Sequence, residues 1–192
     1  MPPLPSAANH LPRIITYYQT HHDSDGKPIS VLPLITRPGI AITHVILAAI
    51  HINSNPLEIT LNNHHPSNPR FQTLWAELRV LQASGVKVMG MLGGAAQGSY
   101  QRLDGNDEQF EQYYCPVRDM IRNRALDGLD LDVEEEMSLA GIVRLVDRLR
   151  SDFGKDFIIT LAPVAMSLLD FTKNLSGFDY EALEVMRGRD IA

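Results

Sequence analysis

The stretch from Ala125 to Glu136 constrains this chain more than any other, because it reads A-L-D-G-L-D-L-D-V-E-E-E. Asp130, Asp132 and Glu134 are two residues apart, and side chains at that spacing point to one face of a β-strand. The leucines and the valine between them point to the opposite face. The sequence therefore predicts three carboxyl groups side by side on one wall.

An acidic strand of this kind can also be a half-exposed strand with one solvated face. The flanking sequence argues against that interpretation, since apolar residues recur at helical spacing over 106–124 and again over 138–153. A strand between two such helices is typical of a parallel sheet, in which both faces are interior. We therefore expect the acids to have a function.

Three neighbouring carboxyl groups are expected to be strongly coupled. They do not all ionise at neutral pH, so at least one proton is shared and at least one pKa is raised. A carboxyl group whose pKa is raised can act as a general acid. The wall is therefore a candidate for acid–base catalysis.

The composition bounds the architecture and the partners. At 192 residues and 44% hydrophobic, the chain can bury one core, so we expect a loose Pro-rich arm over 1–12 and a single domain over 13–192. The net charge of −6, with scattered Lys and Arg, argues against nucleic acid or an anionic membrane and favours a neutral substrate.

The location of the protein is left open by the sequence. The single Cys115 excludes an intramolecular disulfide, and residues 1–10 lack the basic and apolar regions of a signal peptide. No apolar run reaches the roughly 18 to 20 residues of a membrane span. We expect a cytoplasmic protein unless the N-terminus was trimmed.

Strand and helix patterns alternate along the chain. The predicted strands span 13–19, 43–52, 86–92, the acidic stretch and 157–163, and residues 190–192 resemble the start of another. The predicted helices span 30–35, 70–84, 106–124, 138–153 and 179–186. Residues 53–69 are expected to form a long loop with a small strand of its own. Such alternation predicts a parallel sheet with right-handed crossovers.

The acidic stretch resembles a known signature. Asp127, Asp130, Asp132 and Glu134 read D-x-x-D-x-D-x-E, which with Gly128 is similar to the fourth-strand motif of glycoside hydrolase family 18, the chitinases and endo-β-N-acetylglucosaminidases. The third strand resembles the S-x-G-G of that family but has M-L-G-G at 91–94, without the serine, and L-A-P at 161–163 resembles its M-A-P.

The resemblance implies a fold. On length alone, an open doubly wound sheet fits 192 residues, whereas a closed (β/α)8 barrel usually needs about 250. The family signature favours a partial TIM barrel of about five β/α units. The sixth to eighth strands, with a Q-x-Y-N-type motif and a tryptophan, would follow Ala192, so we expect self-association through the open sheet edges.

The resemblance also implies a chemistry that needs no cofactor. In this family the 2-acetamido oxygen of the substrate, and not a protein group, attacks the anomeric carbon. Glu134 would then protonate the glycosidic oxygen and later activate water. Asp132 would hold the acetamide N–H, and Asp130 would share a proton with Asp132.

Further residues are expected to contact the substrate. The aromatic residue of the first strand would be Tyr17 or Tyr18, and Gly93 and Gly94 let a backbone pass close to a ligand. The substrate-binding set also includes Met166. Finally, it includes Asp127, although the position of this residue favours a role in organising the start of the strand.

Three functions therefore compete. The first is a retaining hydrolase that acts on β-1,4-linked N-acetylglucosamine, in chitin or chitooligosaccharides or in the core of an N-glycan. The second is a catalytically inactive remnant or saccharide-binding module of the same fold. The third is a divalent-metal site on the same acids, since clustered carboxylates suit Mg²⁺ or Ca²⁺.

Overall fold

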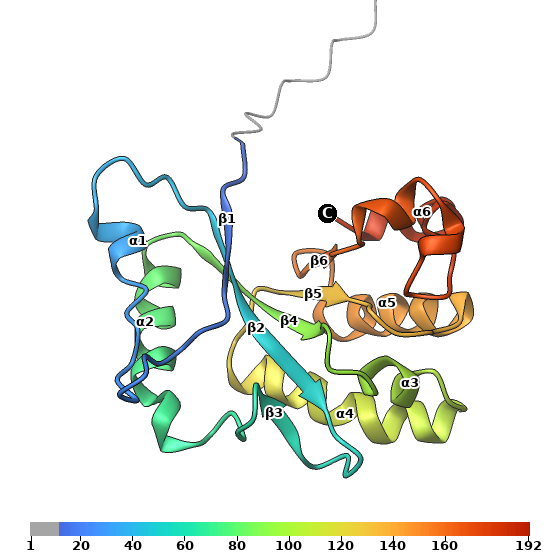
Figure 1. Ribbon diagram of the computed structural model, residues 1–192, viewed down its shortest axis with the longest axis horizontal. Helices are drawn as coiled ribbons and strands as arrows, with labels where there is room; N and C mark the ends of the chain where they lie inside the picture. Colours follow the sequence, from blue (N-terminus) through green and yellow to red (C-terminus); the bar gives the residue numbers. More distant parts are fainter. Residues whose placement is uncertain (1–11) are drawn as a thin grey trace, which may run out of the picture.

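A computed structural model describes residues 12–192, so the arm predicted over 1–12 lies outside the described residues except for Pro12. Five parallel strands form the centre of the molecule (Figure 1). In spatial order they are β1 (Ile15–Tyr18), β2 (His44–Ile52), β4 (Lys87–Gly93), β5 (Gly128–Asp132) and β6 (Ile158–Leu161). A short antiparallel strand, β3 (Ile59–Leu61), pairs with β2 and is the small strand expected within 53–69.

Helices lie around the outside of the curved sheet, between the parallel strands in sequence or after the last of them (Figure 1). They are α1 (Pro33–Thr36), α2 (Gln72–Ala83), α3 (Ser99–Leu103), α4 (Asp107–Asn123), α5 (Leu139–Phe153) and α6 (Tyr180–Arg187). The predicted alternation is confirmed, whereas α3 was not predicted because its five residues are too short for an apolar period. Within residues 12–192, no helix is both long enough and apolar enough to cross a bilayer.

The buried apolar residues form two clusters on opposite faces of the sheet. The larger cluster joins the outward side chains of the strands, such as Leu47 and Leu92, to the apolar faces of α2, α4 and α5. The smaller cluster lies on the inner face and consists of Ile46, Ala48, Ala49, Met89 and Met91. The period of two in each strand explains the division, because neighbouring side chains point to opposite faces.

Side-chain caps fix the two helices that flank the acidic strand. The Asn106 side chain accepts a hydrogen bond from the Gln109 backbone N at 2.9 Å and begins α4. Ser138 begins α5 in the same way, accepting from the Gly141 N at 3.0 Å. Because Ser138 lies six positions after the end of β5, only five residues connect the strand to the cap of α5.

The sheet is open, with β1 at one edge and β6 at the other (Figure 1). A cavity of about 330 Å³ on its inner face is lined by residues of all five parallel strands, among them Tyr17, Met89 and Asp130. Beside β6, the Ala192 N donates to the Ile159 O at 2.8 Å, as a further parallel strand would. The chain is thus an α/β domain with the architecture of a partial (β/α)8 barrel.

The open edge at β1 leads to a prediction. Ile15 and Tyr17, whose side chains line the inner-face cavity beside this edge, remain 45% and 49% exposed, and unpaired strand edges promote pairing between chains. We expect the 192-residue chain to form dimers or larger species as its concentration rises. Light scattering after size-exclusion chromatography measures this, and Ile15→Lys should reduce the association. A monomer at every concentration would contradict the prediction.

Candidate active site

The predicted wall of acids lies on β5 and on the two residues that follow it, the second of which is Glu134. Asp130 is only 1% exposed, whereas Asp132 and Glu134 are half-buried. The alternating Leu129, Leu131 and Val133 are buried in the outer cluster. The carboxyl end of a parallel strand is where α/β barrels place their catalytic groups, and Glu134 lies just past that end.

Two hydroxyl groups hold the Asp130 carboxylate. The Tyr17 phenol donates to Oδ2 at 2.9 Å and the Thr160 hydroxyl donates to Oδ1. Tyr17 comes from β1 and reaches across β2 and β4, which shows how strongly the sheet curves. Burial and the charge of Asp130 raise the pKa of Tyr17, so its hydroxyl keeps the proton that it donates.

Asp132 is the acid whose titration is most altered. Burial, followed by the charges of Glu134 and Asp130, raises the pKa of Asp132 from its ordinary value of 3.8 to about 6. Its carboxyl and that of Glu134 make no hydrogen bond within residues 12–192. Both groups are therefore free to bond a substrate.

We predicted that Asp130 shares a proton with Asp132, but the two carboxyl groups are not hydrogen-bonded to each other in this structure. Both oxygens of Asp130 already accept from hydroxyls on neighbouring strands, so its link with Asp132 is electrostatic. Thr160 was missed in the sequence because a lone threonine in a predicted strand carries no signal. Its position opposite Asp130 in the pairing of β5 with β6 could have indicated it.

Gly93 and Gly94 pack against the acidic strand itself. Both have positive φ angles, and a Cβ on Gly93 would lie 2.4 Å from the Asp132 backbone O. Gly94 donates its N–H to the same oxygen at 2.9 Å. Glycine is therefore required at 93 for close approach of two backbones. Contact of either glycine with a substrate stays a prediction.

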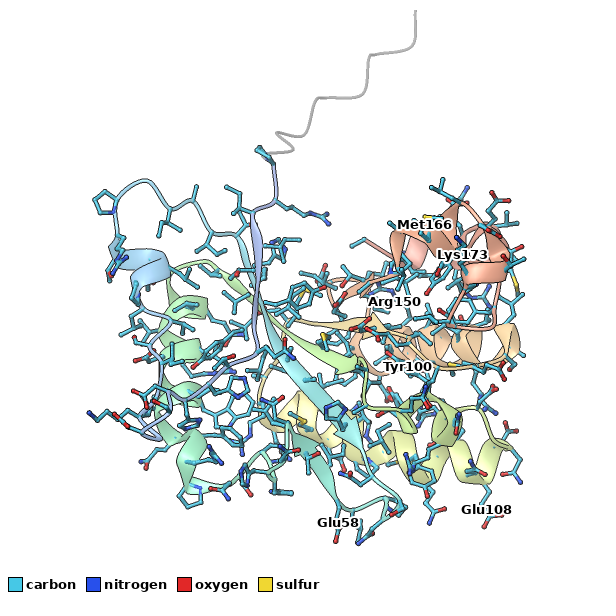
Figure 2. All side chains as sticks on the ribbon, viewed as in Figure 1. Glu58, Tyr100, Glu108, Arg150, Met166 and Lys173 are labelled. Atoms are coloured by element: carbon cyan, nitrogen blue, oxygen red, sulfur yellow. The ribbon has the colours of Figure 1, made fainter. Side chains whose placement is uncertain are left out.

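Two expected substrate-binding residues, Tyr18 and Asp127, do not join this group. Tyr18 lies on the opposite face of β1, where it is part of the outer cluster and donates to the Ile29 O at 2.6 Å. Of the two tyrosines only Tyr17 reaches the acids, since adjacent strand residues point in opposite directions. Met166 is 42% exposed on the segment after β6, where Figure 2 labels it beside Lys173, and its contact with a substrate stays a prediction.

The second of these residues, Asp127, lies at the amino end of β5. Its carboxylate accepts from the Val88 N at 2.8 Å and from the Gln82 amide at 2.6 Å. These bonds tie β5 to β4 and α2 at the end of the strand opposite to Glu134. The structure therefore places Asp127 away from the site, in the organising role that its position favoured.

The acids of the wall are not grouped as the ligands of one metal ion. Within residues 12–192, no group of three or more His, Cys, Asp or Glu side chains is arranged to hold a metal ion. The described residues thus give the Mg²⁺ or Ca²⁺ interpretation no support.

The fold and the site together define a domain of the α/β barrel class with an acidic centre at the carboxyl ends of its strands. The sequence of residues 13–181 matches the glycosyl hydrolases family 18. The chain belongs to this family, as the D-x-x-D-x-D-x-E signature predicted.

Similar proteins include two fungal structures of the same family. The chain is 59% identical to the chitinase ChiC from Aspergillus fumigatus, with a TM-score of 0.90, over 93% of this chain and 64% of that one. It is 55% identical to a fungal endo-β-N-acetylglucosaminidase, with a TM-score of 0.90, over 94% and 64% of the two chains. It is also 33% identical to Chitinase 2 of Rhizopus oligosporus over 119 residues, 55% of this chain and 21% of that protein. The chain thus spans less than two thirds of each.

The raised pKa of Asp132 predicts how stability changes with pH. Between its ordinary value of 3.8 and about 6, the unfolded chain releases a proton that the folded chain retains, so stability falls as the pH rises through this window. Asp132→Asn removes the penalty, so it should raise the melting temperature at pH 7 and change it less at pH 4. Calorimetry at both pH values measures this, and a lower melting temperature at pH 7 would contradict it.

Proposed function

We propose that the chain carries the catalytic acids of a retaining hydrolase of β-1,4-linked N-acetylglucosamine, which works by substrate-assisted catalysis. The observation that supports this most is the acid signature in register on β5, with Asp130 inside the sheet and Glu134 at the open end of the strand. In substrate-assisted glycosidases the 2-acetamido group of the sugar replaces the protein nucleophile. One protein acid is therefore sufficient for bond cleavage.

Glu134 is the group proposed to transfer protons. It is half-buried, and its carboxyl makes no hydrogen bond within residues 12–192, so it can donate to the glycosidic oxygen. After the leaving group departs, the same carboxylate can remove a proton from the attacking water. General acid–base catalysis of this kind contributes about 10² to 10⁴ in rate.

Asp132 is proposed to bind the acetamide N–H and to stabilise the positive oxazolinium ion. Its pKa of about 6 lies near neutral pH, so a small change in its surroundings changes the fraction of the carboxyl group that is ionised. A positive charge that develops beside it favours the carboxylate form, so the interaction strengthens in the transition state. Asp130, held by Tyr17 and Thr160, supplies a fixed negative charge next to it.

The proposal specifies which bond is cleaved, and two classes of substrate contain that bond. Chitin or chitooligosaccharides, and the core of an N-glycan, contain the same β-1,4 linkage between N-acetylglucosamine units. One of the two similar fungal structures is named a chitinase and the other an endo-β-N-acetylglucosaminidase, and their identities to this chain are nearly equal, 59% and 55%. The proposed reaction uses only the β-1,4 linkage and the acetamide group, which both classes of substrate contain.

A saccharide-binding role without hydrolysis is the second candidate. The observation that favours it is the open inner face: β1 and β6 are the edges of the sheet, no strand closes the space between them within residues 12–192, and Asp130 is one of the residues that line the cavity there. An open wall admits water, which weakens the electrostatic interactions that catalysis uses. Binding of a chitooligosaccharide with no turnover would support this role.

The role of Glu134 predicts the effect of a single substitution. Glu134→Gln keeps the shape and removes the donated proton, so turnover of a chromogenic N-acetylglucosamine oligomer should fall at least about 10²-fold while binding is retained. The matched control is Glu108→Gln, since Glu108 is exposed in the first turn of α4, where Figure 2 labels it at the lower edge of the molecule.

The assay is run on two proteins. One is the 192-residue chain, and the other is a chimera in which the part of Aspergillus fumigatus ChiC beyond the matched region follows Ala192. We expect the chimera to be the more active, because further strands exclude water from the wall. Equal turnover by Glu134→Gln and its parent protein would refute the assignment of Glu134.

A further inference from the structure

The carboxyl group next to Glu134 is buried and doubly bonded. Glu135 is 3% exposed, and its two oxygens accept from different backbone N–H groups, Gly98 N at 2.6 Å and Tyr100 N at 2.8 Å. A buried carboxylate is costly unless its oxygens are satisfied, and hydrogen bonds to a charged acceptor are the strong ones. Glu135 is therefore fixed in place and is not part of a solvated acidic run.

The short helix α3 connects Glu135 to the sheet. The Tyr100 hydroxyl donates to the Leu92 O at 2.6 Å, and the Ser99 hydroxyl accepts from the Ile52 N at 3.1 Å. Tyr100 is fully buried, and Figure 2 labels it in the interior of the molecule. The carboxyl ends of β2 and β4 are thereby joined to Glu135 through one turn of helix.

The loop between β4 and α3 contacts the acidic segment at two points. At one end, the Gly94 N donates to the Asp132 O at 2.9 Å. At the other end, the Gly98 N donates to the Glu135 carboxylate. Glu134 lies between these two attachment points in the sequence. The loop thus holds the chain on both sides of the proposed acid, although it makes no hydrogen bond with the Glu134 side chain.

We propose that Glu135 is a positioning residue, whose bonds to Gly98 and Tyr100 hold the Glu134 backbone where its carboxyl meets the substrate. This inference rests on the proposed function, since it takes Glu134 as the acid. Catalysis depends on reacting atoms that are placed to within about 1 Å, and a displacement of that size can cost about 10² in rate. Loss of the Glu135 anchor should therefore reduce turnover more than substrate binding.

The test compares Glu135→Gln with Glu136→Gln. Glutamine keeps the size of Glu135 but presents an NH₂ group to one of the two N–H donors, so one bond is lost. Glu136 is the adjacent, exposed residue and has no hydrogen bond or ion pair within residues 12–192. Three quantities are measured in each variant: amide exchange at Gly94 and Gly98 by NMR, the titration of the Asp132 carboxyl, and kcat with KM.

We expect only Glu135→Gln to change these quantities. Both glycine amides should exchange faster, and the pKa of Asp132 should fall below about 6, because the charge of Glu134 is no longer held beside it. The value of kcat should fall about 10²-fold with KM changed less than about twofold. A helix cap without a positioning role would change the Gly98 exchange alone, and that result would overturn the inference.

The NMR measurements separate this inference from the proposed function. If the parent proteins hydrolyse nothing, the proposed function fails, while altered Gly94 exchange and Asp132 titration would still support the anchor and unchanged values would overturn it. If Glu135→Gln does not fold, Tyr100→Phe removes the hydroxyl bond to the Leu92 O and is assessed by the same three quantities.

Discussion

Mutual repulsion among three carboxyl groups is the constraint on which the rest of this structure depends. The pleat of β5 directs Asp130 and Asp132 to one face, and Glu134 follows at the end of the strand. Repulsion of this kind cannot be relieved within the strand, so neighbouring elements supply the compensation. Tyr17 and Thr160 donate to Asp130 from β1 and β6. Burial, together with the charges of Glu134 and Asp130, raises the pKa of Asp132.

The two halves of the strand differ in how tightly they are held. At the amino end, Asp127 is bonded to β4 and α2, and its role is structural. At the carboxyl end, Asp132 and Glu134 have no hydrogen-bonded partner within residues 12–192, whereas the backbone around them is fixed by Gly94 and by Glu135. A rigid backbone with free side chains is what a preorganised acid–base site requires. Such sites lower stability, as expected where function competes with folding.

The sequence predicted the order and type of the main elements because their patterns are strong. The continuous apolar run of β2 and the helical period of α5 each allow one interpretation. The acid wall followed from spacing alone, and the family from the signature with its glycine. By contrast, α3 could not be predicted, since five residues make little more than one turn and cannot show a recurring apolar pattern.

Residues whose roles depend on partners far along the chain could not be assigned from the sequence. The pair Tyr17 and Tyr18 looks equivalent, and only the pairing of β1 in the sheet decides which one reaches Asp130. Thr160 lies 30 residues from Asp130, and Glu135 is bonded 35 and 37 residues away in the chain. In the sequence Glu135 is one of three consecutive glutamates, but only Glu135 is buried and bonded to backbone N–H groups. Which of three identical neighbours is buried depends on the fold and cannot be inferred from their residue type.

The central claim is that the acid wall acts on a substrate whose own acetamide attacks the anomeric carbon. The most direct test compares turnover of aryl N-acetylglucosamine oligomers in which the acetyl methyl group carries zero, one, two or three fluorine atoms. Each fluorine withdraws electrons and makes the acetamide oxygen a weaker nucleophile. The account predicts that kcat/KM falls steeply along this series, in the chain or in its chimera with ChiC. A rate independent of fluorine content would contradict it, because the nucleophile would then be water or a protein group.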